Sequence, residues 1–389
     1  MRILILTFYY EPDLCAGSFR TTAFVNELRK KIASEDTIDV LTTKPNRYHT
    51  YGKNALGEEK FENVTIRRFN IPVHKSGILD QAKSFLTFYR SCIRYARSQH
   101  YDLVFATSSR LFTAFLGYKI AKQKKLPLYL DIRDIFVDTL QSIYEKKTIR
   151  YVLPLWYFKQ LEKKTCRYAS RINLVSEGFK LYFLSYISED KISVYSNGID
   201  DDFYGINFKS PINNVKKIIT YAGNIGDGQG LHKIIPEVAK FLGDNFIIKI
   251  IGAGGMRDHL EALLKELNIK NVILLDPISR TELVKHYQVA DCLFLHLNNY
   301  RAFEKVLPSK IFEYGATGKP VIAGVSGFSK LFIHENFSNW MIFNPADIND
   351  FKRQYEKFKL EQSNPSVFLN KFRRNTIISR LAVDFLSLK

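Results

Sequence analysis

Short apolar runs rich in β-branched residues alternate along the chain with longer segments of helical periodicity. A strand followed by a helix and a further strand, repeated in this way, is typical of a parallel sheet with helices on its faces. The pattern therefore predicts an α/β fold. In the first half the apolar runs occupy residues 3–7, 38–41, 103–106 and 128–131, and the helical patterns occupy residues 20–33 and 113–122.

The alternation stops around residues 196–214, where turn-forming residues replace the apolar periodicity, and it then starts again. The second half has apolar runs at residues 217–221, 245–251, 272–275, 292–297 and 320–323. We therefore predict two Rossmann-like, doubly wound parallel-sheet domains. The expected division is a first domain over 1–196, a linker over 197–215, a second domain over 216–365, and a closing amphipathic helix over 366–389 that is a candidate for packing back on the first domain.

The length and composition suit this division. The chain has 389 residues, 46% of them hydrophobic, which is enough for two globular domains with large cores. The cysteines are far apart and include no Cys-x-x-Cys pair, so the sequence suggests neither a zinc site nor a disulfide framework. This favours a reducing compartment, and we expect a cytoplasmic protein. The cysteines are Cys15, Cys92, Cys166 and Cys292.

The apolar start of the chain is interpreted as a buried strand rather than a signal peptide. Glu11 and Asp13 follow it at once, and no small-residue cleavage site is present. No stretch approaches 18 uncharged apolar residues, so we expect no membrane-spanning helix. Any membrane contact is then expected to be peripheral.

The formal net charge of +18 points to an acidic partner or to a role in solubility. The excess is steepest between Lys83 and Lys125, where nine lysine and arginine residues, Arg110 among them, are accompanied by one acid, Asp102. Anionic lipid, a diphosphate-linked acceptor and nucleic acid all have the required charge.

Two segments combine bases with aromatic residues, at residues 85–97 and 144–168. Such a helix can lie on anionic lipid, and it can equally pack on the sheet with its bases in solvent. The first interpretation predicts peripheral association with the inner face of the plasma membrane. It also suits a polyprenyl-diphosphate-linked acceptor, whose charge is presented at that surface.

The most specific motif runs from Val306 to Ile322 and includes Pro-Ser-Lys-Ile-Phe-Glu-Tyr, beginning at Pro308. Pro308 and Ser309 supply the start of a helix, and a Gly-x-Pro sequence from Gly318 supplies its end before the next strand. The motif therefore predicts a short helix between a loop and a strand.

Two charged residues of this helix fit a nucleotide diphosphate. Lys310 lies in the first turn, where its ammonium adds to the exposed amides of the helix N-terminus and suits phosphate. Glu313 lies one turn further on the same face, where a carboxylate can accept hydrogen bonds from both hydroxyls of a ribose. The alternative from spacing alone is a solvated lysine and glutamate pair on a surface helix.

Two glycine-rich turns follow strands of the second half. The segment Thr220–Leu231 contains Gly223, Gly226, Gly228 and Gly230 and is interpreted as a phosphate-binding turn, with a plain strand-to-helix connection as the alternative. The segment Ile251–Arg257 begins like a dinucleotide fingerprint, but Arg257 replaces the third glycine, so we expect no nicotinamide site.

Two segments of the first half also follow predicted strands. Tyr9–Arg20 connects the first strand to the first helix, and Tyr129–Phe136 places Asp131 and Arg133 at the carboxyl end of another strand. In parallel sheets this end carries the ligand site. Asp131 and Arg133 are therefore acceptor-site candidates, and an internal salt bridge is the alternative.

The segment around Pro308–Tyr314 resembles the donor-binding signature of family 4 glycosyltransferases, most closely that of bacterial O-antigen and capsule enzymes of the N-acetylfucosaminyltransferase type. The resemblance covers essentially the whole chain in order and implies a GT-B fold, with two Rossmann-like domains facing a cleft. It implies retaining transfer of an acetamido or deoxy-acetamido hexose from a UDP-sugar to a lipid-linked saccharide in surface polysaccharide biosynthesis, with no metal and no other cofactor.

The resemblance also assigns site residues. Lys310 and the helix N-terminus would stabilise the leaving diphosphate, and the donor phosphate itself would accept the proton. The catalytic candidates are Lys310 together with Asp131 and Arg133, which are selected from their position at the carboxyl end of a strand. The donor-binding candidates are Gly17, Arg20, Gly223, Asn224, Gln229, Gly230, Gly252, Gly254, Glu304, Ser309, Lys310, Ile311 and Glu313.

The chain departs from the family pattern at two places. Many members have an arginine and a lysine where this chain has Asn224 and Gln229, so Lys310 and Arg301 are expected to neutralise more of the diphosphate. The first of two family glutamates falls on Lys305, with Glu304 one place early. Since that residue contacts the donor hexose in the family, its change suits a deoxy or acetamido sugar.

Two other functions fit part of the pattern. A nucleotide-sugar epimerase has the same two domains, but the Pro-Ser-Lys-Ile-Phe-Glu-Tyr motif favours a transferase. A basic nucleic-acid-binding protein would explain the charge, but the sequence has no recognisable zinc-finger or ribonucleoprotein motif, so we expect no nucleic-acid partner.

Overall fold

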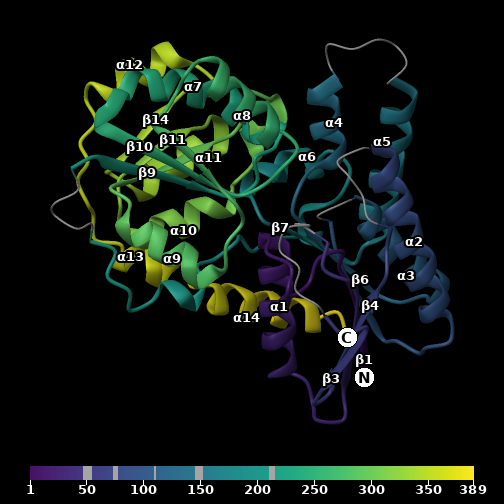
Figure 1. Cartoon of the computed structure of the whole chain (residues 1–389). Helices are drawn as coiled ribbons and strands as arrows, with labels where there is room; N and C mark the ends of the chain where they lie inside the picture. The colour runs from purple at the N-terminus through teal and green to yellow at the C-terminus, as the bar shows by residue number, and fades with distance from the viewer. Residues whose placement is uncertain (47–54, 73–77, 109–110, 145–151, 210–214) are drawn as a thin grey trace. The chain divides into compact units, whose positions relative to one another are not determined.

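The computed structural model describes residues 1–46, 55–72, 78–108, 111–144, 152–209 and 215–389 (Figure 1). The chain divides into two compact units. Unit 1 consists of Met1–Asn197 together with Arg374–Lys389, and unit 2 consists of Gly198–Arg373. Arg110, part of the basic segment 144–168 and part of the expected linker lie outside the described residues.

Unit 1 is built on a sheet in which, over its described part, eight strands follow the order β3-β4-β2-β1-β5-β6-β7-β8. All neighbours pair in parallel except β3, which pairs antiparallel with β4. The central strands β5 and β6 are buried along their whole length, and β1 is buried from Ile3 onward, because helices cover both faces. The strands are β1 (Arg2–Leu6), β2 (Thr37–Thr43), β3 (Glu58–Phe61), β4 (Val64–Phe69), β5 (Leu103–Thr107), β6 (Leu128–Ile132), β7 (Arg171–Leu174) and β8 (Ile192–Val194).

The helices of unit 1 form a layer on each face of this sheet. One layer contains α1 and the C-terminal helix α14, where Phe385 packs edge-on against Phe24 with ring centroids 5.7 Å apart. The other layer contains α2 and α3, with α5 packed on α3. The helices are α1 (Ala16–Arg29), α2 (Ile78–Arg97), α3 (Leu111–Lys124), α4 (Phe136–Tyr144), α5 (Val152–Tyr168), α6 (Lys180–Leu184) and α14 (Arg374–Leu386).

Unit 2 contains a second sheet with the strand order β11-β10-β9-β12-β13-β14 among its described residues. Its neighbouring strands are all parallel. The order reverses between β9 and β12, as in a doubly wound Rossmann sheet. The strands are β9 (Lys217–Ala222), β10 (Phe246–Ile251), β11 (Val272–Leu275), β12 (Cys292–His296), β13 (Val321–Gly324) and β14 (Trp340–Phe343).

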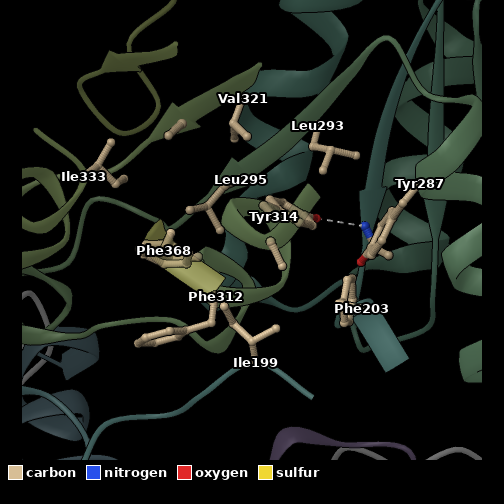
Figure 2. Close-up of a cluster of buried hydrophobic side chains, with 14 of the residues drawn as sticks. Ile199, Phe203, Tyr287, Leu293, Leu295, Phe312, Tyr314, Val321, Ile333 and Phe368 are labelled. Carbon is tan, nitrogen blue, oxygen red and sulfur yellow. Dashed lines mark hydrogen bonds between the residues drawn. The ribbon is translucent and has the colours of Figure 1, made fainter. Parts of the chain in front are cut away.

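Two hydrophobic cores lie on opposite faces of the second sheet. One is formed with α7, α8 and α12, and the other with α9, α10, α11 and α13 (Figure 1). Figure 2 shows the second of these cores around Phe312 and Tyr314 of α10. The helices are α7 (Leu231–Leu242), α8 (Arg257–Glu266), α9 (Arg280–Val289), α10 (Ser309–Thr317), α11 (Gly327–Asn336), α12 (Ile348–Tyr355) and α13 (Ser366–Lys371).

The C-terminal segment expected as one helix over 366–389 forms two helices. The first, α13, lies in unit 2, and the second, α14, lies in unit 1. Phe372 and Arg373 separate them, and the backbone of Phe372 accepts a hydrogen bond from the amide of Ile199 at 2.8 Å. The chain therefore enters and leaves unit 2 at adjacent positions.

Candidate functional site

The strand order of unit 2 places its ligand-binding edge at the carboxyl ends of β9 and β12. Helix connections run to opposite sides of the sheet from these neighbours, which opens a crevice beyond their ends in folds of this class. The loops after the two strands are joined by hydrogen bonds. The amide of Asn298 donates to Gly228 O at 2.9 Å, and Asn298 Nδ2 donates to Asp227 O at 2.9 Å.

The two glycine-rich turns pack backbone against backbone at this edge. The amide of Ile225 donates to Ala253 O at 2.9 Å. Gly252 has φ +147°, and a Cβ added there would lie 1.9 Å from Gly223 O. A Cβ on Gly254 would lie 2.5 Å from Ile225 O. Positions 252 and 254 therefore require glycine, because the two turns pack too closely to leave room for a side chain.

Lys310 of α10 lies beside the first of these turns, at Gly223. A Cβ on Gly223 would lie 2.3 Å from Lys310 Nζ, and the ammonium is 5.2 Å from the centre of the Tyr221 ring. The helix starts at Ser309 after Pro308 and ends before Gly318, which has φ +66°, so its predicted limits are confirmed. The structure thus brings Lys310 and the N-terminus of α10 next to a glycine turn that lies far earlier in the sequence.

Asn224 and Gln229, which replace two bases of the family pattern, bind each other. Asn224 Nδ2 donates to Gln229 Oε1 at 2.7 Å, and the amide of Gly226 donates to the same oxygen at 3.3 Å. Gly230 then adopts φ +60° and directly precedes α7 as its N-cap residue. These side chains shape the turn and add no charge to it.

Glu313 lies on the same helix as Lys310, and its side chain is 13% exposed. Its Oε1 accepts a hydrogen bond from Arg280 Nη1 at 2.8 Å, and Tyr287 Oη is 3.4 Å from its Oε2. Ile311 is fully buried, and its amide donates to Pro308 O at 3.1 Å. Ile311 therefore contributes packing and the first turn of the helix.

Glu304 lies in the 3₁₀ turn Arg301–Lys305 and is exposed. A Cβ on Gly327, which has φ +57°, would lie 2.1 Å from Glu304 O. This close packing fixes the backbone of the turn against the start of α11. It leaves the Glu304 carboxylate on the surface beside Lys305, the position of the family's first glutamate.

In unit 1, Arg20 and Asp131 form an internal ion pair. Both residues are 1% exposed, and Arg20 Nε and Nη2 donate to the Asp131 carboxylate at 2.9 and 3.0 Å. Asn173 Nδ2 donates to the same carboxylate at 2.7 Å. Burial opposes ionisation of Asp131, but Arg20 outweighs it and holds the pKa of the carboxyl below its ordinary value.

Arg20 also binds the backbone just before the chain leaves unit 1 at Asn197. Its Nη1 donates to Ser196 O at 2.7 Å, and its Nη2 donates to Tyr195 O at 2.9 Å. The alternative of an internal salt bridge therefore describes Asp131, with Arg20 as its partner. Neither residue has more than 1% of its surface exposed.

Arg133 lies beside Gly17 at the same end of the sheet. A Cβ on Gly17 would lie 3.1 Å from Arg133 Nη1, and that nitrogen is buried without a hydrogen-bond acceptor in the described part of the chain. Burial lowers the pKa of the Arg133 guanidinium. A buried donor without an acceptor is costly, so Nη1 is the atom of this cluster best suited to hold an anion.

The two basic aromatic segments differ in what they expose. In α2, Phe85 and Phe88 are buried, and Phe88 packs edge-on against Phe8 with ring centroids 5.5 Å apart. In α5, by contrast, Trp156 is 62% exposed and Tyr157 is 58% exposed. No helix within the described ranges is both long and apolar enough to cross a membrane.

Three residues near the donor-side candidates were not predicted from the sequence. Tyr221 Oη donates to Asn224 O at 2.6 Å, and His296 Nδ1 lies 2.6 Å from Gln229 O. Arg280 contacts Glu313, as described above. Tyr221 and His296 lie at the ends of strands β9 and β12, a position that could have marked them, but the contact of Arg280 joins residues 33 positions apart.

The family model and the relatives that match this chain are all glycosyltransferases. The family model for glycosyl transferases group 1 matches residues 204–376. The Methanocaldococcus jannaschii protein MJ1607, an uncharacterized glycosyltransferase, is 30% identical over 357 residues, which cover 88% of this chain and 85% of MJ1607. The Escherichia coli K12 glycosyl transferase WcaI, named for colanic acid biosynthesis, is 27% identical over 141 residues, which cover 36% of this chain and 34% of WcaI.

Solved structures share the fold. The Anabaena protein HepE, crystallised in complex with UDP, aligns over 100% of both chains with a TM-score of 0.61 and 15% identity. With the two parallel sheets described above, this likeness makes the fold GT-B-like and confirms the predicted fold class.

Proposed function

Because this chain belongs to the group 1 glycosyltransferases, the retaining family 4, we propose that it transfers an acetamido or deoxy-acetamido hexose from a UDP-sugar to a lipid-linked saccharide. The setting would be the biosynthesis of a bacterial surface polysaccharide. The colanic acid role in the name of WcaI supports this setting.

The observation that carries the proposal is the contact between Lys310 and the Gly223 turn. It places a cation and the N-terminus of α10 at the reversal point of the unit 2 sheet, where ligands bind in this class of fold. A diphosphate there would accept hydrogen bonds from Lys310 and from amides of the turn. Charge on the departing nucleotide would be stabilised in the transition state more than in the ground state.

Uridine is proposed as the base because HepE was crystallised with UDP. Glu313 is proposed to accept hydrogen bonds from the ribose hydroxyls, as its place one turn after Lys310 suggests. Glu304 is proposed to contact the donor sugar. Its displacement by one position from the family pattern supports an altered hexose, of the acetamido or deoxy-acetamido kind.

Unit 1 is proposed to bind the acceptor. Arg133 Nη1, which is buried beside Gly17, would hold an anionic group, and the diphosphate of a polyprenyl-linked saccharide has that charge. Asp131 would orient this region through Arg20 rather than touch the acceptor, because it is buried.

We also propose that the enzyme works in the cytoplasm at the inner face of the plasma membrane. The exposed side chains of Trp156 and Tyr157 support this, since aromatic residues favour the headgroup region of a bilayer. The exposed bases Lys159 and Lys164 follow on the same helix and would face anionic headgroups.

The test is calorimetric titration of the full chain with UDP, GDP and ADP. We expect UDP to bind most tightly, and we expect Lys310→Ala to weaken it by roughly tenfold or more, since a charge-assisted hydrogen bond contributes about 1.5–3 kcal/mol. Lys330→Ala, at an exposed lysine of α11, is the matched control and should bind UDP like the wild type. Wild-type protein that binds none of the three nucleotides would contradict the proposal.

A further inference from the structure

Arg280, the first residue of α9, is held between two carboxylates from distant parts of unit 2. Its Nη1 donates to Glu313 Oε1 at 2.8 Å, and its Nη2 donates to Asp200 Oδ2 at 2.6 Å. The guanidinium also stacks over the ring of Phe203, with Cζ 4.9 Å from the ring centre. Its side chain is only 15% exposed. A planar guanidinium with several fixed donors suits such a bridging position better than an ammonium does.

The contact determines how the Glu313 carboxylate is turned. One oxygen, Oε1, is directed at Arg280, so the other is directed toward Tyr287 Oη at 3.4 Å. Each carboxylate oxygen has two lone pairs, so these contacts leave capacity for further donors. The Arg280 contact therefore fixes the orientation of the group and still allows it to bind hydroxyls.

The side chains around Arg280 pack against one another. Tyr287 is fully buried, and its ring packs edge-on against Tyr314 with centroids 5.6 Å apart, while it stacks on Phe203 with centroids 6.3 Å apart (Figure 2). Arg280 is also fixed from the helix side. Ser279 caps α9, and its hydroxyl accepts a hydrogen bond from the amide of Glu282.

Asp200 holds the guanidinium through a different nitrogen from the one that Glu313 contacts. It follows Ile199, whose amide donates to Phe372 O at 2.8 Å, at the point where the chain enters unit 2. Burial would lower the pKa of Arg280, but Glu313 and Asp200 raise it above its ordinary value, so the guanidinium stays charged. Asp202 Oδ2 also lies 3.7 Å from Arg280 Nε, so three carboxylates share one cation here and the cluster keeps a net negative charge.

We propose that Arg280 is a positioning residue for nucleoside recognition: it holds Glu313 in the orientation that accepts hydrogen bonds from the ribose hydroxyls of the donor. This inference rests on the proposed function, in which Glu313 binds the ribose. Arg280 itself does not touch the nucleotide, and its effect passes through Glu313.

The test compares the affinities of UDP and 2′-deoxy-UDP in the wild type, Arg280→Gln, Arg280→Lys, Glu313→Gln and the double variant Arg280→Gln/Glu313→Gln. We expect the wild type to prefer UDP by roughly tenfold, as one charge-assisted hydrogen bond implies. Arg280→Gln should lose most of that preference while its 2′-deoxy-UDP affinity changes little. Arg280→Lys should restore part of it, and the double variant should behave like Glu313→Gln.

The ratio of the two affinities does not depend on the folded fraction, so a partly unfolded variant remains informative. Arg353→Gln, which removes another ion-paired arginine of unit 2, is the control and should keep the wild-type ratio. If Arg280→Gln keeps the ratio, or weakens both ligands alike while Glu313→Gln removes the preference, the positioning role is wrong and the donor site stands. If the wild type binds UDP no better than 2′-deoxy-UDP, or binds neither, the ribose role of Glu313 fails and the inference fails with it.

Discussion

At the scale of single residues, the proposed donor site depends on a glycine whose side-chain position is occupied by a neighbour. Gly223 has φ +143°, and the space of a Cβ is taken by Lys310 Nζ. A residue other than glycine would suffer backbone strain and would also displace the ammonium. Backbone strain can be separated from displacement of the ammonium by comparison with Gly205. This glycine has φ +74° and nothing within 4 Å of its Cβ position.

We predict that Gly223→Ala and Gly205→Ala each lower the free energy of unfolding by about 1 kcal/mol or more, because both place alanine at positive φ. Only Gly223→Ala should also weaken UDP binding, by roughly tenfold, since it moves Lys310. Thermal unfolding and calorimetric titration measure the two effects. Gly223→Ala protein that binds UDP like the wild type would show that the Lys310 contact is not needed.

A second prediction at this scale concerns His296, which joins two loops of unit 2. Its Nδ1–H donates to Gln229 O, and its Nε2 accepts a hydrogen bond from the amide of Ala346 at 3.0 Å. Both contacts require the neutral ring, because a proton on Nε2 would face an N–H group. Burial lowers the pKa of His296 to about 4.

The unfolded chain therefore binds a proton at His296 between about pH 6.5 and 4 that the folded chain does not. Stability should fall as the pH falls through this window, by about 3 kcal/mol, since the two pKa values differ by about 2.5 and one pKa unit corresponds to about 1.4 kcal/mol. His296→Gln should flatten the pH dependence of urea unfolding in this range. Equal slopes for variant and wild type would contradict the assignment.

At the scale of secondary-structure elements, α14 is the element whose packing is easiest to test. It places Phe385, fully buried, between Phe24, Phe105 and Tyr129, while Val383 two positions earlier is 57% exposed. The helix closes a face of the unit 1 sheet although it follows all of unit 2 in the sequence.

We predict that Phe385→Ala costs unit 1 about 3–5 kcal/mol, the usual loss for a buried phenylalanine, and that Val383→Ala stays within about 0.5 kcal/mol. The chain has two tryptophans, Trp156 in unit 1 and Trp340 in unit 2, so a Trp340→Phe background lets fluorescence report unit 1 alone. A similar loss for both variants would mean that α14 does not pack as described.

The elements predicted from the sequence are those with strong patterns. The apolar runs at 217–221, 272–275 and 292–297 match β9, β11 and β12 within a residue. Of these, β12 is buried along its whole length, and strands buried on both faces have near-continuous apolar runs in their sequence, whereas β11 lies at the sheet edge and is only partly buried. The helix expected at 20–33 begins earlier, as α1 at Ala16, and element ends are set by local contacts that periodicity does not contain.

Other elements escaped prediction because their patterns are weak. The strand β3 reads Glu-Glu-Lys-Phe at the edge of the sheet, and β8 has only three residues. At the candidate site, the role of Lys310 in a helix N-terminus could be predicted locally. Its contact with Gly223 could not, because only the doubly wound topology brings β9 and α10 together.

At the scale of the whole molecule, the net charge of +18 has to be related to particular surfaces. Basic residues alone do not show whether a segment binds lipid or lies in solvent. In α2, Phe85 and Phe88 are buried, so they cannot insert into a bilayer, and among the described side chains of this helix Leu86 is the large apolar one that is exposed, at 45%. In α5, Trp156 and Tyr157 are exposed beside bases, which is the combination that favours a headgroup region.

We therefore predict that the full chain binds vesicles rich in phosphatidylglycerol and that Trp156→Ala/Tyr157→Ala reduces this binding by roughly tenfold, from the apolar area lost at the interface. Added salt should weaken binding further, because the electrostatic part is screened. Leu181→Ala, at an 84% exposed leucine of unit 1, is the control and should bind like the wild type.

If the aromatic variant keeps full binding while salt abolishes it, the contact is electrostatic and the bases of α2 and neighbouring surfaces carry it without insertion. Vesicles of phosphatidylcholine separate the two parts, since the aromatic contribution should persist there and the charge contribution should not.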